Sequence, residues 1–253
     1  MIGVRLNIPD VSGLPLNAIQ AAHFMMPPGV TGIRWCNFLG HDVQLSALNR
    51  VRGQPNGSVA GAPTVSPNYL GLKNGSIGSG GKQIKTSFVD TAGLTYIAIV
   101  RSSDTGADNA HTFNVIGNHS ATVAGADLYL RTSATGWQFR LAVMISGVPT
   151  FTGGVAITTA PADWRMIIAS GDAASHSIYD MTGAVSNTVA VATNTGRVIA
   201  TETINIGGSA SGNRGGVGDV GLTMVLDHVA TPEERAAIYA FYKPIFTGLG
   251  IAI

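Results

Sequence analysis

Large apolar and polar residues alternate in many short stretches of this chain. The clearest stretch is "WQFRLAVMI", from Trp137 to Ile145, in which every second residue is a large apolar one and Gln138 and Arg140 lie between them. Successive side chains of a β-strand point to opposite faces of the sheet. The stretch therefore predicts a strand with one buried face and one face that is at least partly wet.

Stretches of this kind recur from Ile33 onward and are separated by turn-forming residues. The separators include Asn-Gly, Gly-Gly and Ser-Gly pairs, which supply the positive φ angles that tight turns need, and "SGVP" and "YDMTG" are predicted hairpin turns. Helical patterns of about 10 to 15 residues, which parallel βαβ units require, do not lie between the stretches. The pattern predicts antiparallel strands at "IRWCNF", "KQIKTSF", "LTYIAIVR", "HTFNVIG", "DLYLRT", "WQFRLAVMI", "WRMIIASG", "HSIYD", "AVSNTVAVAT", "ETINIGG" and "DVGLTMVLDHV".

The exception is one helix near the end of the chain. Thr231 is a good N-cap, Pro232 suits the first helical position, and Glu234 completes a Thr-X-X-Glu capping box. Pro244 is expected to end this helix. An apolar stripe is expected to dock it on a sheet, at Ala237, Ile238, Phe241 and Tyr242.

Composition supports an all-β class and narrows the possible partners. The chain has 253 residues, of which 33 are glycine, and only 11% of its residues are charged, as is typical of short strands joined by tight turns. A net charge of +1 without a run of basic residues disfavours nucleic acid and anionic membranes as partners. The apolar runs are too short to span a membrane, and the first residues lack a signal-peptide pattern, so we expect synthesis in a cytoplasm.

The pattern divides the chain into three parts. Residues 1–32 lack sustained periodicity and are expected to form an N-terminal arm or attachment segment, and residues 33–246 are expected to form one sandwich domain. Residues 247–253 form an uncharged apolar tail. Such a tail docks either on its own domain or as an added strand on a neighbour, and its apolar positions are Leu249, Ile251 and Ile253.

The aromatic residues and the cysteine in the apolar stretches are expected to be buried. Cys36 is the only cysteine, so the chain has no internal disulfide and the thiol is interpreted as a small buried hydrophobe. Trp35, Trp137 and Trp164 lie in apolar strand patterns and are interpreted as core residues.

The end of the chain resembles the close of a known fold family. The strand "DVGLTMVLDHVA", followed at once by the Thr-Pro-Glu-Glu helix, is similar to the last strand and sealing helix of concanavalin A-like, laminin G-like jelly-roll domains. "INIGG", "LTYIAIVRSSD" and "WRMIIASGD" resemble other strands of that family, in the same order. The resemblance covers roughly residues 33–246 and implies an all-β, antiparallel two-sheet jelly-roll sandwich with one short C-terminal helix.

The resemblance also implies a class of function. The composition looks most like the versions of this fold in bacteriophage virions, as tail-fibre, tailspike or head-decoration modules. This resemblance implies a virion structural protein, assembled in the host cytoplasm, that forms a homo-oligomer, contacts other virion proteins and adheres to bacterial surface polysaccharide. A stand-alone carbohydrate-binding module remains an alternative.

A polysaccharide-degrading enzyme is the less favoured alternative. The Glu-X-Asp-X-Glu pattern of the related glucanases is missing, and the glutamates of the chain are Glu202, Glu233 and Glu234. Glycosidases generally need two carboxylates that face each other across a cleft. The last two glutamates are better explained by helix capping, so we predict that the chain is not an enzyme.

The candidate carbohydrate-binding residues lie on two strands and in one glycine-rich loop. Tyr129 and Arg131 share one face of "DLYLRT", and Gln138 and Arg140 share the polar face of "WQFRLAVMI". If the two strands are neighbours, these side chains form one patch on the sheet; a plain solvated face is the alternative. Loops at the rim of the sandwich often shape glycan sites in the resembled family. The glycine-rich loop "NIGGSASGNRGGVGD" therefore adds two residues to the candidates. The full candidate set is Tyr129, Arg131, Gln138, Arg140, Asn213 and Arg214.

A polar loop, "RSSDTGADNAH", offers oxygen ligands that calcium prefers. Asp104, Asp108 and Asn109 are the candidate ligands. The EF-hand template does not fit, because Asn109 takes the glycine position and Val115 takes the position of the bidentate glutamate. A solvated loop without metal is the alternative interpretation.

Overall fold

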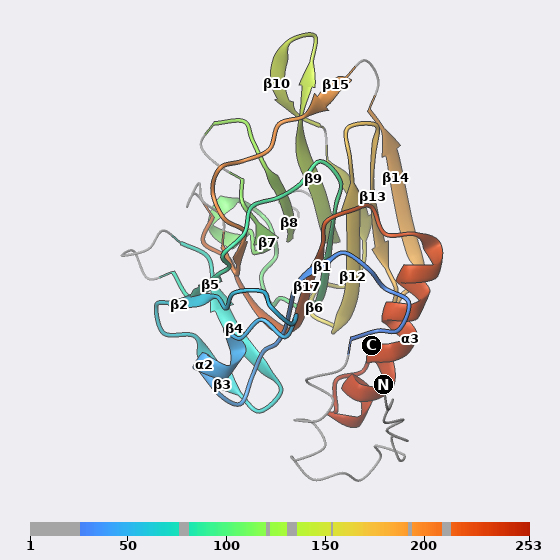
Figure 1. The fold of residues 1–253 in the computed structure, drawn as a ribbon. Helices are drawn as coiled ribbons and strands as arrows, with labels where there is room; N and C mark the ends of the chain where they lie inside the picture. Colours follow the sequence, from blue (N-terminus) through green and yellow to red (C-terminus); the bar gives the residue numbers. More distant parts are fainter. Residues whose placement is uncertain are drawn as a thin grey trace.

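Two antiparallel sheets pack face to face in the computed structural model, which describes residues 26–75, 81–119, 122–130, 136–152, 154–191, 194–208 and 214–253 (Figure 1). The first sheet, which we call sheet A, has the order β14 (Val185–Ala190), β13 (Ser175–Asp180), β12 (Arg165–Gly171), β6 (Leu94–Arg101), β17 (Val217–Leu226), β4 (Tyr69–Lys73) and β3 (Thr64–Ser66), and β1 (Ile33–Phe38) also pairs with β17.

The second sheet, sheet B, faces it across the core. Its order is β10 (Val148–Phe151), β9 (Gly136–Ile145), β8 (Ala126–Leu130), β7 (Asn114–Gly117), β16 (Asn205–Ile206), β5 (Gln83–Lys85) and β2 (Ser58–Ala60), and β11 (Val155–Thr158) and β15 (Asn194–Arg197) also pair with β9. The predicted all-β, antiparallel two-sheet jelly-roll sandwich is confirmed.

The two predicted hairpin turns form where the sequence indicates. Ser146 and Gly147 join β9 to β10 with positive φ angles of 49° and 79°. The carboxylate of Asp180 accepts the backbone N–H groups of Thr182 and Gly183, each at 2.9 Å, and holds the turn between β13 and β14. Both turns give the antiparallel pairing that was predicted.

The main core lies between the sheets. The alternating residues of β9 that were expected to be buried, from Trp137 to Val143, point into it, whereas Gln138 and Arg140 point outward. Tyr96 from sheet A meets Phe139 from sheet B edge-to-face, with ring centroids 6.0 Å apart. Trp35 and Trp137 are fully buried, as predicted, and Trp164 is half-buried in a second cluster.

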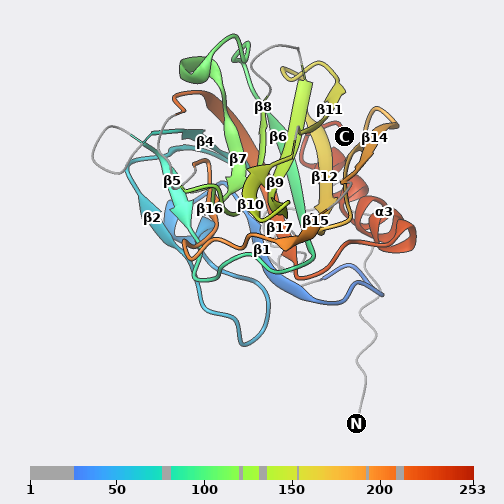
Figure 2. The ribbon, with the colours of Figure 1, turned by 90° about the horizontal axis from the view of Figure 1, so that it is seen from above.

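The second cluster lies on the outer face of sheet A, under helix α3 (Pro232–Gly248). Figures 1 and 2 both place α3, drawn in red, beside the sheet that contains β12 and on the side away from β8. Its buried apolar stripe is Ile238, Tyr242 and Phe246. The thiol of Cys36 lies 3.5 Å from the Tyr242 hydroxyl, and burial raises the pKa of Cys36 to about 12, which makes this cysteine an unreactive core residue.

The start of α3 is as predicted and its end is not. The Thr231 hydroxyl accepts the Glu234 N–H at 3.2 Å, and the Glu234 carboxylate accepts the Thr231 N–H at 3.0 Å, which completes the capping box. The prediction that Pro244 ends the helix is wrong. Pro244 lies on the exposed face, and the helix continues to Gly248 because buried Phe246 anchors its last turn.

The chain end then packs on its own domain. Gly250, at a φ of 77°, ends the helix, and the N–H of Ile251 donates to the carbonyl of Phe246 at 2.9 Å. Ile251 and Ile253 are buried in the cluster under α3. The described tail therefore docks on its own domain, which is the first of the two alternatives that the sequence left open. Met26 and Val30, from the part of the predicted arm that the structure describes, pack against the same cluster.

Two short helices also lie in the part of the chain that the structure describes, α2 (Val43–Ser46) and the 3-10 helix η1 (Asn109–His111). Within the described ranges, no helix has the length and apolar character needed to cross a membrane.

Candidate functional site

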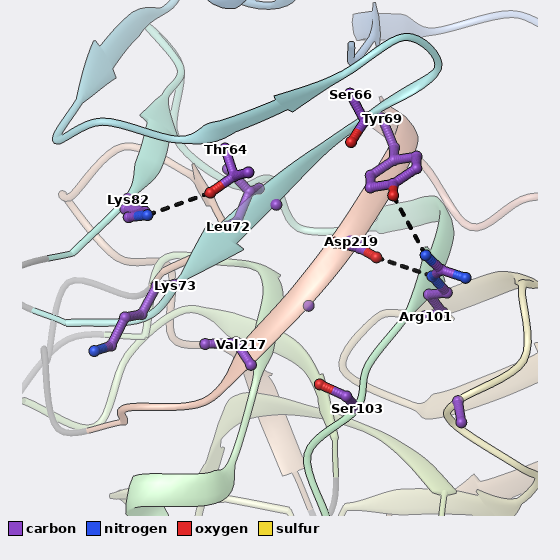
Figure 3. A pocket seen from close by; sticks show the side chains of 13 residues that line it. Thr64, Ser66, Tyr69, Leu72, Lys73, Lys82, Arg101, Ser103, Val217 and Asp219 are labelled. Carbon is purple, nitrogen blue, oxygen red and sulfur yellow. Dashed lines mark hydrogen bonds and ion pairs between the residues drawn. The ribbon is translucent and has the colours of Figure 1, made fainter.

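A cavity of about 470 Å³ opens on the outer face of sheet A, where β3, β4, β17 and β6 lie side by side (Figure 3). We call it the sheet A pocket. Ligand sites of proteins commonly have this size and combine apolar walls with a few polar groups. Its lining residues are Thr64, Ser66, Tyr69, Gly71, Leu72, Lys73, Lys82, Arg101, Ser103, Ala162, Val217, Gly218 and Asp219.

The register of the four strands builds the floor of the pocket. Thr64 pairs with Gly71, Gly71 pairs with Asp219, and Asp219 pairs with Arg101. These four residues therefore form one row across the sheet. Since Leu70 on β4 points into the core, its neighbour Gly71 faces outward.

Glycine at position 71 keeps the middle of this row open. A Cβ atom there would lie 3.2 Å from the Thr64 Cβ and 3.5 Å from Asp219 Oδ1. The backbone of Gly71 does not have a positive φ, so its conformation does not require glycine. The effect of glycine is on the space, because any side chain at position 71 would project into the pocket.

The pocket begins where helix α3 stops covering sheet A. The register of β17 shifts between Val220 and Leu222; before the shift β17 pairs with β4, and after it β17 pairs with β1 and lies under the helix. The side chain of Asn68, next to β4, donates to the carbonyl of Leu249 at 2.9 Å and fixes this border. One face of one sheet is thus divided into a packed half and an open half.

A rigid group of planar side chains forms one wall. Arg101 Nε donates to Asp219 Oδ2 at 2.9 Å, and the Arg101 guanidinium carbon lies 4.8 Å from the ring centroid of Trp164 and 5.3 Å from that of Tyr69. The Tyr69 and Trp164 rings meet edge-to-face at 5.4 Å. Because each group is held by two others, the wall presents its ring and guanidinium in a fixed orientation.

The opposite wall carries amines and a hydroxyl. Lys82 Nζ donates to Thr64 Oγ1 at 3.4 Å, and Lys73 lies beside them at the end of β4. Figure 3 shows Tyr69 and Arg101 on one side of the pocket and Lys82 and Lys73 on the other. The predicted strands do not include β3 and β4, although "YLGLK" in β4 alternates and could have indicated a strand.

The patch predicted on β8 and β9 does come together. The two strands are neighbours, with Tyr129 opposite Gln138, and the Tyr129 hydroxyl donates to Gln138 Oε1 at 2.8 Å. The guanidinium carbon of Arg214 lies 3.9 Å from the Tyr129 ring centroid, and that of Arg140 lies 5.3 Å from it. Arg131 and Asn213 lie outside the described residues.

A carboxylate that sequence reasoning missed organises this patch. Asp127 is fully buried, and its Oδ2 lies 3.1 Å from Arg140 Nη2, 3.3 Å from Arg214 Nη1 and 3.4 Å from His119 Nδ1. Burial acts to raise the pKa of Asp127, but the attraction of the arginines and the histidine outweighs it and the pKa is lowered. Asp127 lies two residues before Tyr129 in "ADLYL", so the two side chains share one face of the strand. This spacing could have identified Asp127 as a member of the patch.

The side chains of this patch are mostly engaged with one another. Tyr129 and Arg214 are each only 7% exposed, and Gln138 Nε2 donates to the carbonyl of Gly154 at 3.0 Å. These contacts favour a structural role for the patch. Carbohydrate binding by its residues stays a prediction, while the sheet A pocket offers open space.

The candidate calcium ligands serve the backbone of their own loop. The Asp108 carboxylate accepts the N–H of His111 at 3.0 Å and caps η1, which begins at Asn109. The Asp104 carboxylate accepts the N–H of Val217. In the part of the chain that the structure describes, no group of three or more His, Cys, Asp or Glu side chains is placed to hold a metal ion. Calcium binding by these residues stays a prediction.

Comparison with known proteins gives structural matches alone. No protein-family model matches the chain, and no curated protein matches it in sequence. The solved structures that it resembles include the botulinum neurotoxin serotype D binding domain, with a TM-score of 0.59, 11% identity, and coverage of 83% of this chain and 50% of that chain.

Two further matches are binding domains of botulinum neurotoxin DC. One is in complex with rat synaptotagmin II (TM-score 0.59, 10% identity, 84% and 52% of the two chains), and the other is in complex with SialylT (0.58, 8%, 84% and 52%). The chain spans about half the length of these structures. At this identity the likeness establishes the fold, and these neighbours are binding domains with a β-sandwich of the same kind.

Proposed function

We propose that this chain is a non-enzymatic glycan-binding domain and that the sheet A pocket is its site. The observation that carries the proposal is the fixed wall of Tyr69, Arg101 and Asp219 beside open space. A sugar ring has apolar C–H faces and a rim of hydroxyl groups. A rigid aromatic ring suits the first, and planar guanidinium and carboxylate groups suit the second.

The carboxylates of the pocket support binding over catalysis. Asp219 is the carboxylate among the lining residues, and it already pairs with Arg101 at 2.9 Å. Glycoside hydrolysis generally uses two carboxyl groups on either side of the scissile bond, one as acid and one as base or nucleophile. Solved structures of similar fold that are binding domains support the same conclusion.

Two substitutions test the pocket by different routes. Tyr69→Ala removes the aromatic wall, and Gly71→Val fills the floor without removing a polar group. Each is expected to raise the Kd for the polysaccharide that binds best on a bacterial glycan array by at least about 30-fold. This corresponds to about 2 kcal/mol of binding free energy, as for a central residue of an interface.

Tyr239→Ala is the matched control, because Tyr239 lies on α3 and does not line the pocket. It should leave the Kd unchanged. If the wild-type protein binds no polysaccharide, or if both pocket variants stay folded and bind as the wild type does, the proposal is wrong.

We also propose that the domain is a homo-oligomeric subunit of a bacteriophage virion, as a tail-fibre, tailspike or head-decoration module. The family resemblance of the sequence and the edge of sheet A support this. Strand β14 is the last strand of the sheet, all its residues are exposed, and "VSNTVA" carries no charge, although natural edge strands are commonly protected by charges. Such an edge suits pairing with the same edge of a second copy around a two-fold axis.

Light scattering of the purified protein tests this role. The wild type is expected to have at least twice the monomer mass, and the double variant Val185→Lys/Val189→Lys is expected to be a monomer, since charges on an edge oppose strand pairing. Val148→Lys is the matched control, because Val148 is 60% exposed but lies on β10. A wild-type protein that is monomeric at every concentration would rule out this edge as an interface.

A further inference from the structure

Positive charge is concentrated in the sheet A pocket. Its lining contains the cations Lys73, Lys82 and Arg101 and the single carboxylate Asp219, whereas the whole chain has a net charge of only +1. Asp219 is already neutralised by Arg101. Among the described residues, neither lysine forms an ion pair with a carboxylate. The pocket therefore holds two cationic groups that the described residues do not compensate with a carboxylate.

The backbone forces these two lysines together. Lys73 N donates to the carbonyl of Lys82 at 3.1 Å, and Lys82 N donates to the carbonyl of Lys73 at 2.8 Å. Residues paired in this way across antiparallel chains project their side chains to the same face. Like charges placed directly opposite are destabilising. A bound anion between the two amines would remove this repulsion and would form charge-assisted hydrogen bonds with both.

We infer that the ligand of the pocket is an anionic glycan, whose acidic group lies between Lys73 and Lys82 while a sugar ring of the same ligand packs against Tyr69. The inference rests on the proposed glycan-binding function and adds the class of ligand. The two walls in Figure 3 suit these two parts, since Lys73 and Lys82 lie on one side of the pocket and Tyr69 lies on the other; the Lys82 amine points toward Thr64, and the Lys73 side chain must turn inward to meet the acidic group. The shared chemistry is an anionic group on a sugar, either a carboxylate or a phosphate.

An array of bacterial polysaccharides, each printed in its native and its carboxyl-reduced form, tests the inference. Reduction converts each uronic acid to a neutral sugar and leaves the ring in place. The strongest native ligands are expected to be acidic, and reduction is expected to weaken binding at least about tenfold, the loss of about one charge-assisted hydrogen bond. A glycosylated teichoic acid, which carries phosphate in place of carboxylate, identifies the second source of charge if it binds instead.

Charge variants assign the effect to the pocket. Lys73→Gln/Lys82→Gln should weaken binding to the native polysaccharide about tenfold and should leave binding to the reduced form unchanged. Lys85→Gln/Lys243→Gln removes the same charge outside the pocket and should bind like the wild type.

Three results would overturn the inference, and one of them also reaches the proposed function. If neutral polysaccharides bind best, or if carboxyl reduction changes nothing for uronic acid polysaccharides and the teichoic acid does not bind more tightly than neutral polysaccharides, glycan binding stands and the anionic class is wrong. If polyglutamate binds as tightly as the best polysaccharide, the pocket recognises charge without a sugar. If no polysaccharide binds in either form, the glycan-binding proposal itself fails.

Discussion

Replacement of Asp127 with asparagine is expected to lower the free energy of unfolding by about 3–5 kcal/mol, the usual loss when one partner of a buried ion pair is removed. The substitution keeps the shape of the side chain but removes the charge between Arg140 and Arg214. The Arg214 side chain is only 6% exposed, so water cannot replace the lost carboxylate. Urea denaturation at pH 7 measures the difference.

Asp227→Asn is the control for the same chemical change at the surface. Asp227 pairs with Arg34 at 2.8 Å, but the side chains are 27% and 49% exposed, so the loss should stay below about 1 kcal/mol. If Asp127→Asn costs no more than this control, the cluster around Asp127 does not stabilise the fold.

The effect of Asp127→Asn should also depend on pH. The pKa of Asp127 is lower in the folded protein than in the unfolded chain, so the charged form contributes stability above the ordinary aspartate pKa of about 4. That contribution is lost as the pH falls through the folded pKa. The part of the difference in stability between wild type and variant that comes from the charge of Asp127 should therefore shrink below about pH 4.

Phe246→Ala is expected to cost about 3–5 kcal/mol of stability, the range for a large buried aromatic residue. Phe246 is 1% exposed and stacks on Phe38 with ring centroids 5.9 Å apart. It lies beyond Pro244, where the helix lacks one backbone hydrogen bond and depends on side-chain packing. Loss of the ring should also fray the last turn, which circular dichroism would detect.

Phe241→Ala is the matched control on the same helix. Phe241 is half-buried and lies before Pro244, so its removal should cost clearly less. Equal losses for the two variants would mean that Phe246 does not specifically anchor the end of α3.

The alternating pattern predicts the strands whose two faces differ in polarity. Strands β1 and β6 begin and end where "IRWCNF" and "LTYIAIVR" indicate. The pattern misses β3 because three residues are too few to show a period, and one of them, Val65, is an exposed apolar residue. The predicted end of α3 at Pro244 was wrong for a different reason. Tertiary packing of Phe246 overrides the tendency of Pro244 to end a helix.

The candidate site shows where sequence reasoning stops. The sequence places Tyr129 and Gln138 together only if β8 and β9 are neighbours, a condition that the register of the two strands meets. The sheet A pocket joins β4 to β17, which are distant in the chain, and local patterns do not determine that pairing. The burial of Asp127 could not be predicted either, because the sequence does not show that its carboxylate forms ion pairs with Arg140 and Arg214.

The outer face of sheet A is covered by α3 at one end of β17 and open at the other end. At the open end, residues that line the pocket and residues that form the core are on opposite faces of the sheet. Outward residues at the open end, such as Thr64, Lys73 and Lys82, line the pocket without belonging to either apolar cluster. Inward residues of the same region, such as Leu70 and Val220, hold the core. Under the proposed function, substitutions at the first set are expected to change ligand preference while the fold stays intact. A lineage built on this scaffold would then diversify its recognition by drift at a few surface positions.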